Sequence, residues 1–360
     1  MSPSSSPRTL DEPVLDRGLP SPNFGGPGGV DSGVVDACIS AYMERIYPVV
    51  PFLTTEILRS EAADSTTSLL SRQFIASFCA YVVTFGKVLD DSSFISLHSS
   101  SSDLGTQLLA SALRIQVPER VSTPTWQSVF VSFFLYGAYA GLGNYRQGWF
   151  YLREATTLFM MRKFSDDHEG LYTQDVHRCL FWILVISERY VTPQFRHTYT
   201  DLCSSPNRAH AIRKNRPITL QVTTSSPSLI DSSFIGLQYL ASLLRPFDEV
   251  FFAVWNGSQQ ECSKEWLLGI ERDVRTALPP MLSVPNEQIA NLRISQLWLQ
   301  TKLWELFPRF GFLSSDSVYE CLTFRYPITV ARDLSVLAVK LPIGSLQVHG
   351  VGMVRITVLF

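Results

Sequence analysis

The stretch HRCLFWILVISER, residues 177–189, decides the fold class that we predict for this chain. Its apolar residues run without a break from Cys179 to Ile186, and polar or charged residues stand at both ends. The stretch contains no glycine or proline, and it is longer than the roughly four to eight residues of a buried strand. This pattern is typical of a buried helix, which we expect over residues 172–189.

A second helical pattern begins at residue 34, in VVDACISAYMERIYPVVPFL. Apolar residues recur there every three or four positions from Val35 to Ile46, which gives a helix one apolar face. We expect Pro48 and Pro51 to end it, because proline lacks the amide hydrogen that a helix needs. Similar patterns predict further helices over residues 67–89, 104–116, 124–142, 145–163, 231–254, 260–277, 286–308 and 318–340.

Local signals mark some of the boundaries. Thr123 followed by Pro124 predicts a helix start, with threonine as the N-cap and proline at the first helical position. GLGN at 141–144 predicts a helix stop, because glycine adopts the left-handed conformation found there. The serine-rich segments 90–103 and 223–233 are expected to be surface loops.

These patterns predict an all-α chain with about ten helices in one large domain, residues 34–353. No stretch alternates in a way that requires a strand, although SVLAVKLPI at 335–343 is ambiguous. Residues 1–33 are rich in Ser, Pro and Gly and cannot bury enough apolar surface to fold, so we interpret them as a disordered leader or linker.

Composition narrows the classes of function. Only 17% of the residues are charged, and the net charge is −2, which argues against a chain that coats nucleic acid through bulk charge. Residues 121–145 carry no charge, but their apolar part is shorter than the ~20 residues of a membrane span. We interpret this stretch as a buried core helix.

The sequence carries no recognisable catalytic, cofactor-binding or metal-binding motif. The cysteines are scattered, without a C-x-x-C pair, and most stand in apolar helical contexts where a free thiol is buried. The histidines show no metal-ligand spacing, and the nucleotide, hydrolase and metalloprotease motifs are missing. The sequence therefore predicts no catalytic, cofactor-binding or metal-binding residue; the six cysteines are Cys38, Cys79, Cys179, Cys203, Cys262 and Cys321.

Three charged features remain. Glu154 and Glu188 each stand beside an arginine inside a predicted helix; adjacent helical residues point in different directions, so we expect each acid to pair across helices and tie elements together. The acidic run 166–169, which includes His168, is expected to be a solvated turn. The basic run RKNRP at 213–217 is interpreted as a short exposed cluster; binding of phosphate or of an import receptor is the alternative.

Four motifs in fixed order resemble a known family. They are YPVVPFL (47–53), GNYRQGWFYLREATTLFMM (143–161), HRCLFWILVISER (177–189) and RKNRPITL (213–220). Together they resemble the middle homology region of fungal zinc-cluster transcription factors, most closely the branch of maltose and amylolytic activators. The residues that match are Trp149, Tyr151, Leu152, Arg153, Glu154 and Ala155 in the second motif, and Arg178, Phe181, Trp182, Glu188 and Arg189 in the third. His177 stands where the family often has an arginine.

The resemblance covers residues from about 34 to 353 and implies a function. It implies an all-helical regulatory domain of a nuclear, sequence-specific RNA polymerase II regulator that controls carbohydrate-utilisation or secondary-metabolite genes. Family members read DNA through a separate N-terminal zinc cluster of six cysteines. Residues 1–33 contain no cysteine, so we expect no zinc cofactor and no DNA readout in this chain as written.

The resemblance leaves the partners open. A small-molecule inducer, a homodimer or a co-regulator fits it, and no membrane is implied. Two alternatives to the leading interpretation remain: a stand-alone co-regulator that does not bind DNA, and an α-helical metabolic enzyme. The enzyme would need convergent titratable groups in a pocket, and the sequence predicts none.

One segment is foreign to the family pattern. The family runs almost directly from the "ER" of the third motif into the fourth, whereas residues 190–208 intervene here. We interpret these residues as a retained intron translated in frame, because their removal restores the family spacing; a genuine surface loop is the alternative. Residues 354–360 are interpreted in the same way, as an aberrant tail.

Overall fold

The chain is all-α in the computed structural model, which describes residues 29–48, 50–85, 101–162, 172–189, 218–223, 226–229 and 234–342. Within these ranges there is no strand, and twelve helices have seven residues or more, which confirms the predicted fold class. These helices are α1 (Ser32–Ala41), α2 (Thr55–Asp64), α3 (Leu69–Phe85), α4 (Ser101–Arg114), α6 (Trp126–Gly141), α7 (Tyr145–Met161), α8 (Gln174–Arg189), α10 (Ile235–Leu244), α11 (Glu249–Asn256), α12 (Lys264–Thr276), α13 (Asn286–Trp304) and α15 (Tyr326–Lys340). Shorter elements are η1 (Tyr42–Ile46), α5 (Glu119–Ser122), α14 (Leu306–Arg309) and η4 (Glu320–Leu322).

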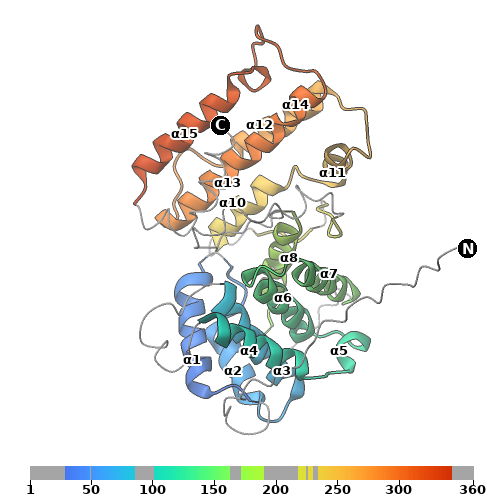
Figure 1. Cartoon of the computed structure of the whole chain (residues 1–360), viewed down its shortest axis with the longest axis vertical. Helices are drawn as coiled ribbons and strands as arrows, with labels where there is room; N and C mark the ends of the chain where they lie inside the picture. The colour runs from blue at the N-terminus through green and yellow to red at the C-terminus, as the bar shows by residue number, and fades with distance from the viewer. Residues whose placement is uncertain are drawn as a thin grey trace, which may run out of the picture.

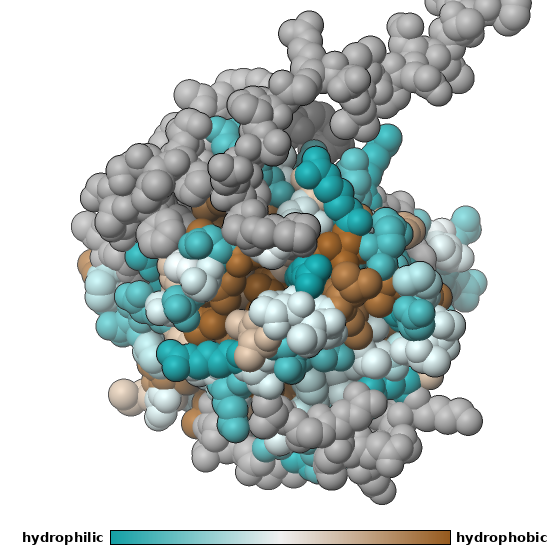
Figure 2. Space-filling model, turned by 90° about the horizontal axis from the view of Figure 1, so that it is seen from below, coloured by the Kyte–Doolittle hydropathy of each residue, from teal (hydrophilic) through white to brown (hydrophobic). Residues whose placement is uncertain are grey.

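The helices form two groups in sequence order. Figure 1 shows α1 to α8 gathered in the lower half of the molecule and α10 to α15 in the upper half. One hydrophobic cluster runs through both groups, from Val34 to Leu334, so the two halves share a continuous core. Helix α3 packs between α4 and α6, and α6 packs in turn against α7. On the face seen from below, hydrophobic side chains lie at the centre and hydrophilic ones surround them (Figure 2).

The centre of the lower half is a cluster of aromatic rings around Phe134 of α6. Phe134 is fully buried, and its ring lies 5.4 Å from that of Phe74 and 5.5 Å from that of Phe78, both on α3. Both pairs are edge-to-face, the geometry that the aromatic quadrupole favours. The other rings within about the same range belong to Phe52, Tyr81, Phe130 and Phe133.

Two glycines of α6 permit its close approach to α3. A Cβ atom on Gly137 would lie 2.3 Å from the ring of Tyr81, and one on Gly141 would lie 2.5 Å from the carbonyl oxygen of Thr84. Real Cβ atoms do not approach other atoms so closely. Residues 126–141 of the uncharged stretch thus form a core helix, and its small residues decide how near its neighbour can lie.

Several boundaries differ from those predicted. Helix α6 begins one residue after Thr125, which forms a capping box with Ser128, and not at Thr123 and Pro124. Helix α2 was not predicted; Thr54 caps it by accepting a hydrogen bond from Ile57 N at 3.3 Å. The helix predicted over 231–254 is two helices, because Asp248 caps a new start at α11.

Other ends agree with their sequence signals more closely. Gly143 has φ 81°, the left-handed conformation expected of the stop at 141–144. The first helical segment ends with η1, before Pro48. The serine-rich loop predicted over 90–103 is helical at its described end, because α4 already begins at Ser101. The helix predicted over 318–340 begins only at Tyr326, with Pro327 in its first turn, and residues 335–340 of the ambiguous stretch are helical.

Buried amides satisfy helix carbonyls that have no partner within their own helix. Gln73 Nε2 donates to Ala112 O at 3.2 Å near the end of α4, and Gln296 Nε2 donates to Val274 O at 2.9 Å near the end of α12. The last carbonyls of a helix lack intrahelical partners, so such long-range donors fix where one helix ends against another.

Phe134→Ala is expected to lower the free energy of unfolding by about 3–5 kcal/mol, because it leaves a cavity among rings that are wholly buried. Phe150→Ala is the matched control on the adjacent helix, since Phe150 is 61% exposed, and we expect it to change stability by less than about 0.5 kcal/mol. Urea denaturation followed by circular dichroism measures both. Equal losses in the two variants would contradict the aromatic cluster as the centre of the core.

Candidate functional site

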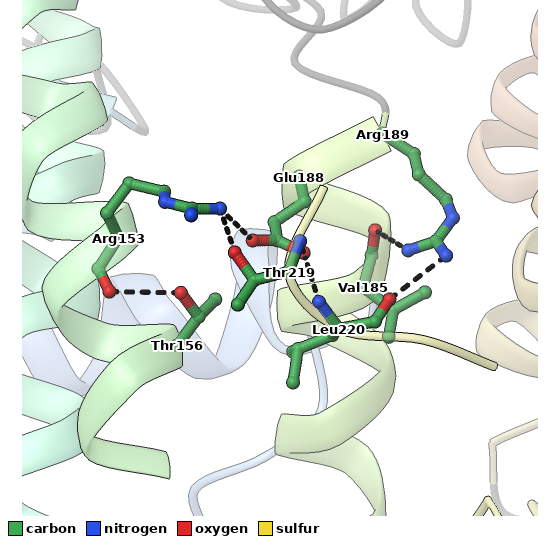
Figure 3. Close-up of polar contacts among 7 residues, drawn as sticks. All are labelled: Arg153, Thr156, Val185, Glu188, Arg189, Thr219 and Leu220. Atoms are coloured by element: carbon green, nitrogen blue, oxygen red, sulfur yellow. Dashed lines mark hydrogen bonds and ion pairs between the residues drawn. The ribbon is translucent and has the colours of Figure 1, made fainter. Parts of the chain in front are cut away.

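Residues from three of the family-like motifs meet at the end of α8. Arg153 comes from α7, Glu188 and Arg189 form the last turn of α8, and Thr219 and Leu220 lie on a segment without regular secondary structure (Figure 3). In the sequence this segment lies about thirty residues beyond α8. The fold therefore brings this segment back into contact with the end of α8.

Glu188 holds the backbone of this segment. Its side chain is 0% exposed, and Oε2 accepts hydrogen bonds from Thr219 N at 3.0 Å and from Leu220 N at 2.8 Å. Oε1 accepts from an Arg153 guanidinium nitrogen at 3.2 Å, and the same nitrogen contacts the Thr219 hydroxyl. The carboxylate thus satisfies two amide hydrogens that no secondary structure would satisfy, through charge-assisted bonds that are stronger than neutral ones.

Arg189 holds the same segment from the other side. It is 1% exposed, and it donates to Leu220 O at 3.0 Å and to Phe247 O, between α10 and α11, at 2.8 Å. A third donor reaches Val185 O within α8 at 3.4 Å. Burial lowers the pKa of the Arg189 guanidinium to about 10, so it remains charged at neutral pH. We call the two residues the Leu220 clamp, because Glu188 binds the N–H of Leu220 and Arg189 binds its C=O.

A second acid, which is partly buried, ties α5, α6 and α7 together. Glu154 of α7 forms an ion pair with Arg120 of α5 at 2.8 Å, and its second oxygen accepts from the Ser132 hydroxyl of α6 at 2.9 Å. Arg120 leaves its other terminal nitrogen buried without a hydrogen-bond partner. Both oxygens of Glu154 are occupied, which is the arrangement of a structural acid.

A third acid, Glu61, connects α2 with the start of α6 and with the residues before α8. Its Oε1 accepts from the Tyr172 hydroxyl at 2.7 Å and from Gln127 Nε2 at 2.9 Å. Its Oε2 is buried and has no hydrogen-bond partner. Glu61 thus joins three parts of the lower half through one oxygen.

His177 packs as an aromatic ring. It stacks on Phe159 with ring centroids 5.2 Å apart and meets Trp126 edge-on at 5.1 Å. Burial, together with the nearby Arg162 and Arg178, lowers the pKa of His177 to about 4. The imidazole is therefore neutral near pH 7.

The predicted pairing of the two acids across helices is confirmed, for Glu154 by Arg120 and for Glu188 by Arg153. The partners Arg120 and Thr219 were not predicted, because neither carries a local sequence signal that marks it. Of the remaining family-like residues, Leu152, Ala155, Phe181 and Trp182 are buried in the core. The Trp182 indole also donates to Pro227 O at 2.8 Å.

The cysteines with a described position are mostly buried, as expected: Cys38, Cys79, Cys179 and Cys321 are buried and Cys262 is partly exposed. Within the described ranges, no group of three or more His, Cys, Asp or Glu could hold a metal ion. The segments 1–28, 190–217 and 343–360 lie outside the described residues, and with them Cys203, the basic run 213–217, the inserted residues 190–208 and the tail 354–360. The acidic run 166–169 lies outside them as well.

Comparison with known proteins gave no match to the chain among protein-family models, curated proteins or solved structures. In the part of the chain that the structure describes, no helix has both the length and the apolar character to cross a membrane.

Glu188→Ala is expected to lower the free energy of unfolding by about 3–5 kcal/mol, because it leaves Arg189 buried without its neighbouring charge and two amide hydrogens without acceptors. Asp175→Ala serves as control, since the Asp175–Arg178 ion pair on the same helix is exposed and its loss costs about 0–1 kcal/mol. Chemical denaturation of both variants gives the comparison. A loss below about 1 kcal/mol in Glu188→Ala would show that the clamp does not hold the fold.

Deletion of residues 190–208 is expected to preserve the fold. Glu188 contacts Thr219 and Leu220 directly, and the nine residues 209–217 that remain span up to about 30 Å when extended, more than the gap requires. The shorter loop should raise the free energy of unfolding by about 1 kcal/mol. Denaturation measures this, and a Gly/Ser segment of equal length in place of 190–208 separates loop length from sequence.

A deletion variant that fails to fold would show that residues 190–208 belong to the domain, against their interpretation as an intron. Transcript sequencing tests the origin of the segment independently. Spliced transcripts that lack the corresponding nucleotides are expected, and transcripts that all retain them would exclude the intron.

Proposed function

We propose that this chain is the regulatory domain of a fungal sequence-specific RNA polymerase II transcription regulator, acting in the nucleus on carbohydrate-utilisation or secondary-metabolite genes. One observation supports this most directly. The Leu220 clamp and the Arg153–Glu188 ion pair beside it join residues from the second, third and fourth motifs of the family resemblance, which are far apart in the sequence. A shared tertiary site gives a physical reason for these motifs to occur together in one chain.

The state of the buried charges favours a regulatory role over catalysis at this place. Both oxygens of Glu188 and both oxygens of Glu154 accept hydrogen bonds, and the Arg189 donors are used on backbone carbonyls. A general base must lie within reach of a substrate proton, and the Glu188 side chain is 0% exposed. These groups hold helices together, as a domain that transmits a bound signal to a partner requires.

Under this proposal the chain does not read DNA by itself. DNA recognition in such a regulator depends on a six-cysteine zinc cluster, and the scattered cysteines of this chain do not form one in sequence. The domain would instead receive a small-molecule inducer, pair with a second copy or bind a co-regulator. A stand-alone co-regulator that lacks any DNA-binding module is the second candidate, favoured by the same scatter of cysteines.

The test is a reporter assay in a fungal host with the full chain fused to a foreign DNA-binding module. We expect reporter transcription to change at least about threefold relative to the module alone on at least one carbon source. Fusion of the Glu188→Ala variant, with its level checked by immunoblotting, should lose the change. Reporter output that stays constant on every carbon source would contradict the proposal.

The upstream reading frame and promoter occupancy by the native protein distinguish the two candidates. A regulator with its own DNA-reading module has a C-x2-C-x6-C pattern in the reading frame upstream of residue 1, and the encoded protein occupies promoters without a partner. A stand-alone co-regulator lacks that pattern and reaches promoters only through another protein. Location of the fluorescently tagged chain outside the nucleus under all conditions would contradict both.

A further inference from the structure

Exposed apolar side chains concentrate at the end of the described chain. Six of the thirteen large apolar residues that are exposed within the described ranges lie between residues 318 and 339. Single exposed apolar residues need no explanation, but a contiguous group indicates an interaction surface. The six are Val318, Tyr319, Phe324, Ile328, Val336 and Val339.

Helix α15 presents two apolar faces. Its inner face packs on α13 through Val330 and Leu334, which are buried, and it reaches α12 through Tyr326, whose hydroxyl donates to Glu271 at 3.2 Å. Its outer side carries Ile328 and Val339, which are 61% and 88% exposed. Figure 1 shows α15 at the edge of the upper half, so no labelled helix covers its outer side there.

The outer residues follow the spacing of a helix-packing seam. Arg325, Ile328, Arg332, Val336 and Val339 are separated by three or four residues, so they form one stripe along α15, which we call the α15 outer face. A narrow stripe of this spacing is typical of the seam between two packed helices. Helices that lie in a membrane surface use a broader face with Trp, Phe or Leu, which this stripe lacks.

The charges on this stripe have one sign. Arg325 and Arg332 lie within it and Lys340 follows it; all three are exposed, and none forms an ion pair with the described part of the chain. The nearby acids are Asp333 and Glu320, which lie on its flank. Glu320 accepts a hydrogen bond from Thr329 at 2.6 Å. Partial burial and Glu320 raise the pKa of Asp333, and the neighbouring Arg332 lowers it.

We propose that the α15 outer face binds an acidic amphipathic helix of a partner protein, with the partner's apolar stripe on Ile328, Val336 and Val339 and its carboxylates on Arg325, Arg332 and Lys340. Charge complementarity selects this occupant. A second copy of the same stripe would place Arg332 against Arg332 when Ile328 meets Val336 in an antiparallel pair, and like charges in contact are unfavourable. This inference stands whether or not the chain regulates transcription.

The test uses the full chain and a fluorescein-labelled peptide of about three heptads, with Leu at positions a and d and Glu at e and g. A second peptide carries Lys in place of Glu. We expect fluorescence anisotropy to show the acidic peptide binding at least about tenfold more tightly than the basic one. Binding of the acidic peptide should weaken when the salt concentration is raised, because salt then screens the charges more strongly. The Debye length falls from about 14 Å to about 4 Å over the range to be tested.

Variants localise the binding. Val339→Asp is expected to weaken binding of the acidic peptide at least about tenfold, and Arg332→Glu at least about threefold. Met281→Asp is the matched control, because Met281 is an apolar residue that is 87% exposed elsewhere in the same half of the molecule. The Met281→Asp variant should bind the acidic peptide as tightly as the parent chain does. Circular dichroism checks that all three variants are folded.

Three results would overturn the proposal. The first is equal binding of the acidic and basic peptides, and the second is binding to Val339→Asp as tight as to the parent chain. The third is a dimer of the parent in analytical ultracentrifugation that Val339→Asp abolishes, since the face would then belong to a second copy of this chain. A parent that sediments as a monomer and prefers the acidic peptide supports the proposal.

Discussion

The Leu220 clamp is the interaction on which the arrangement of the two halves depends. A buried carboxylate and a buried guanidinium each cost several kcal/mol to remove from water, and that cost is offset only when their hydrogen bonds are made with good geometry. Glu188 and Arg189 achieve this by taking the N–H and the C=O of one residue, Leu220. Few positions of the segment satisfy both groups, so the clamp fixes the returning chain in one place.

The clamp also acts beyond Leu220. Arg189 reaches Phe247 O in the turn between α10 and α11, and Arg153 extends the contact to α7. The apolar core that surrounds these residues is stabilised by a non-directional effect, which does not by itself choose one angle between helices. Directional polar contacts at helix ends make that choice, as the buried amides of Gln73 and Gln296 do for α4 and α12.

The sequence predicted those parts of the fold that depend on local patterns. Helices α7 and α8 lie almost where their apolar periodicity places them, whereas the start of α6 moved because Thr125 and not Thr123 reaches the amide of Ser128. It was predictable that Glu154 and Glu188 form ion pairs across helices, because charged residues inside apolar helices need partners. The partners themselves were not, because Arg120 lies 34 residues from Glu154 and tertiary packing alone brings them together.

Two groups of cations in this chain are used in opposite ways. One group is wholly or partly buried, and each member binds an acid or backbone carbonyls: Arg120, Arg153 and Arg189. These bonds favour a single arrangement of the helices. Arg325, Arg332 and Lys340 are exposed beside apolar residues that no described helix covers. Under the proposed docking of an acidic helix, this difference in pairing would separate the charges that hold the fold from the charges that face a partner.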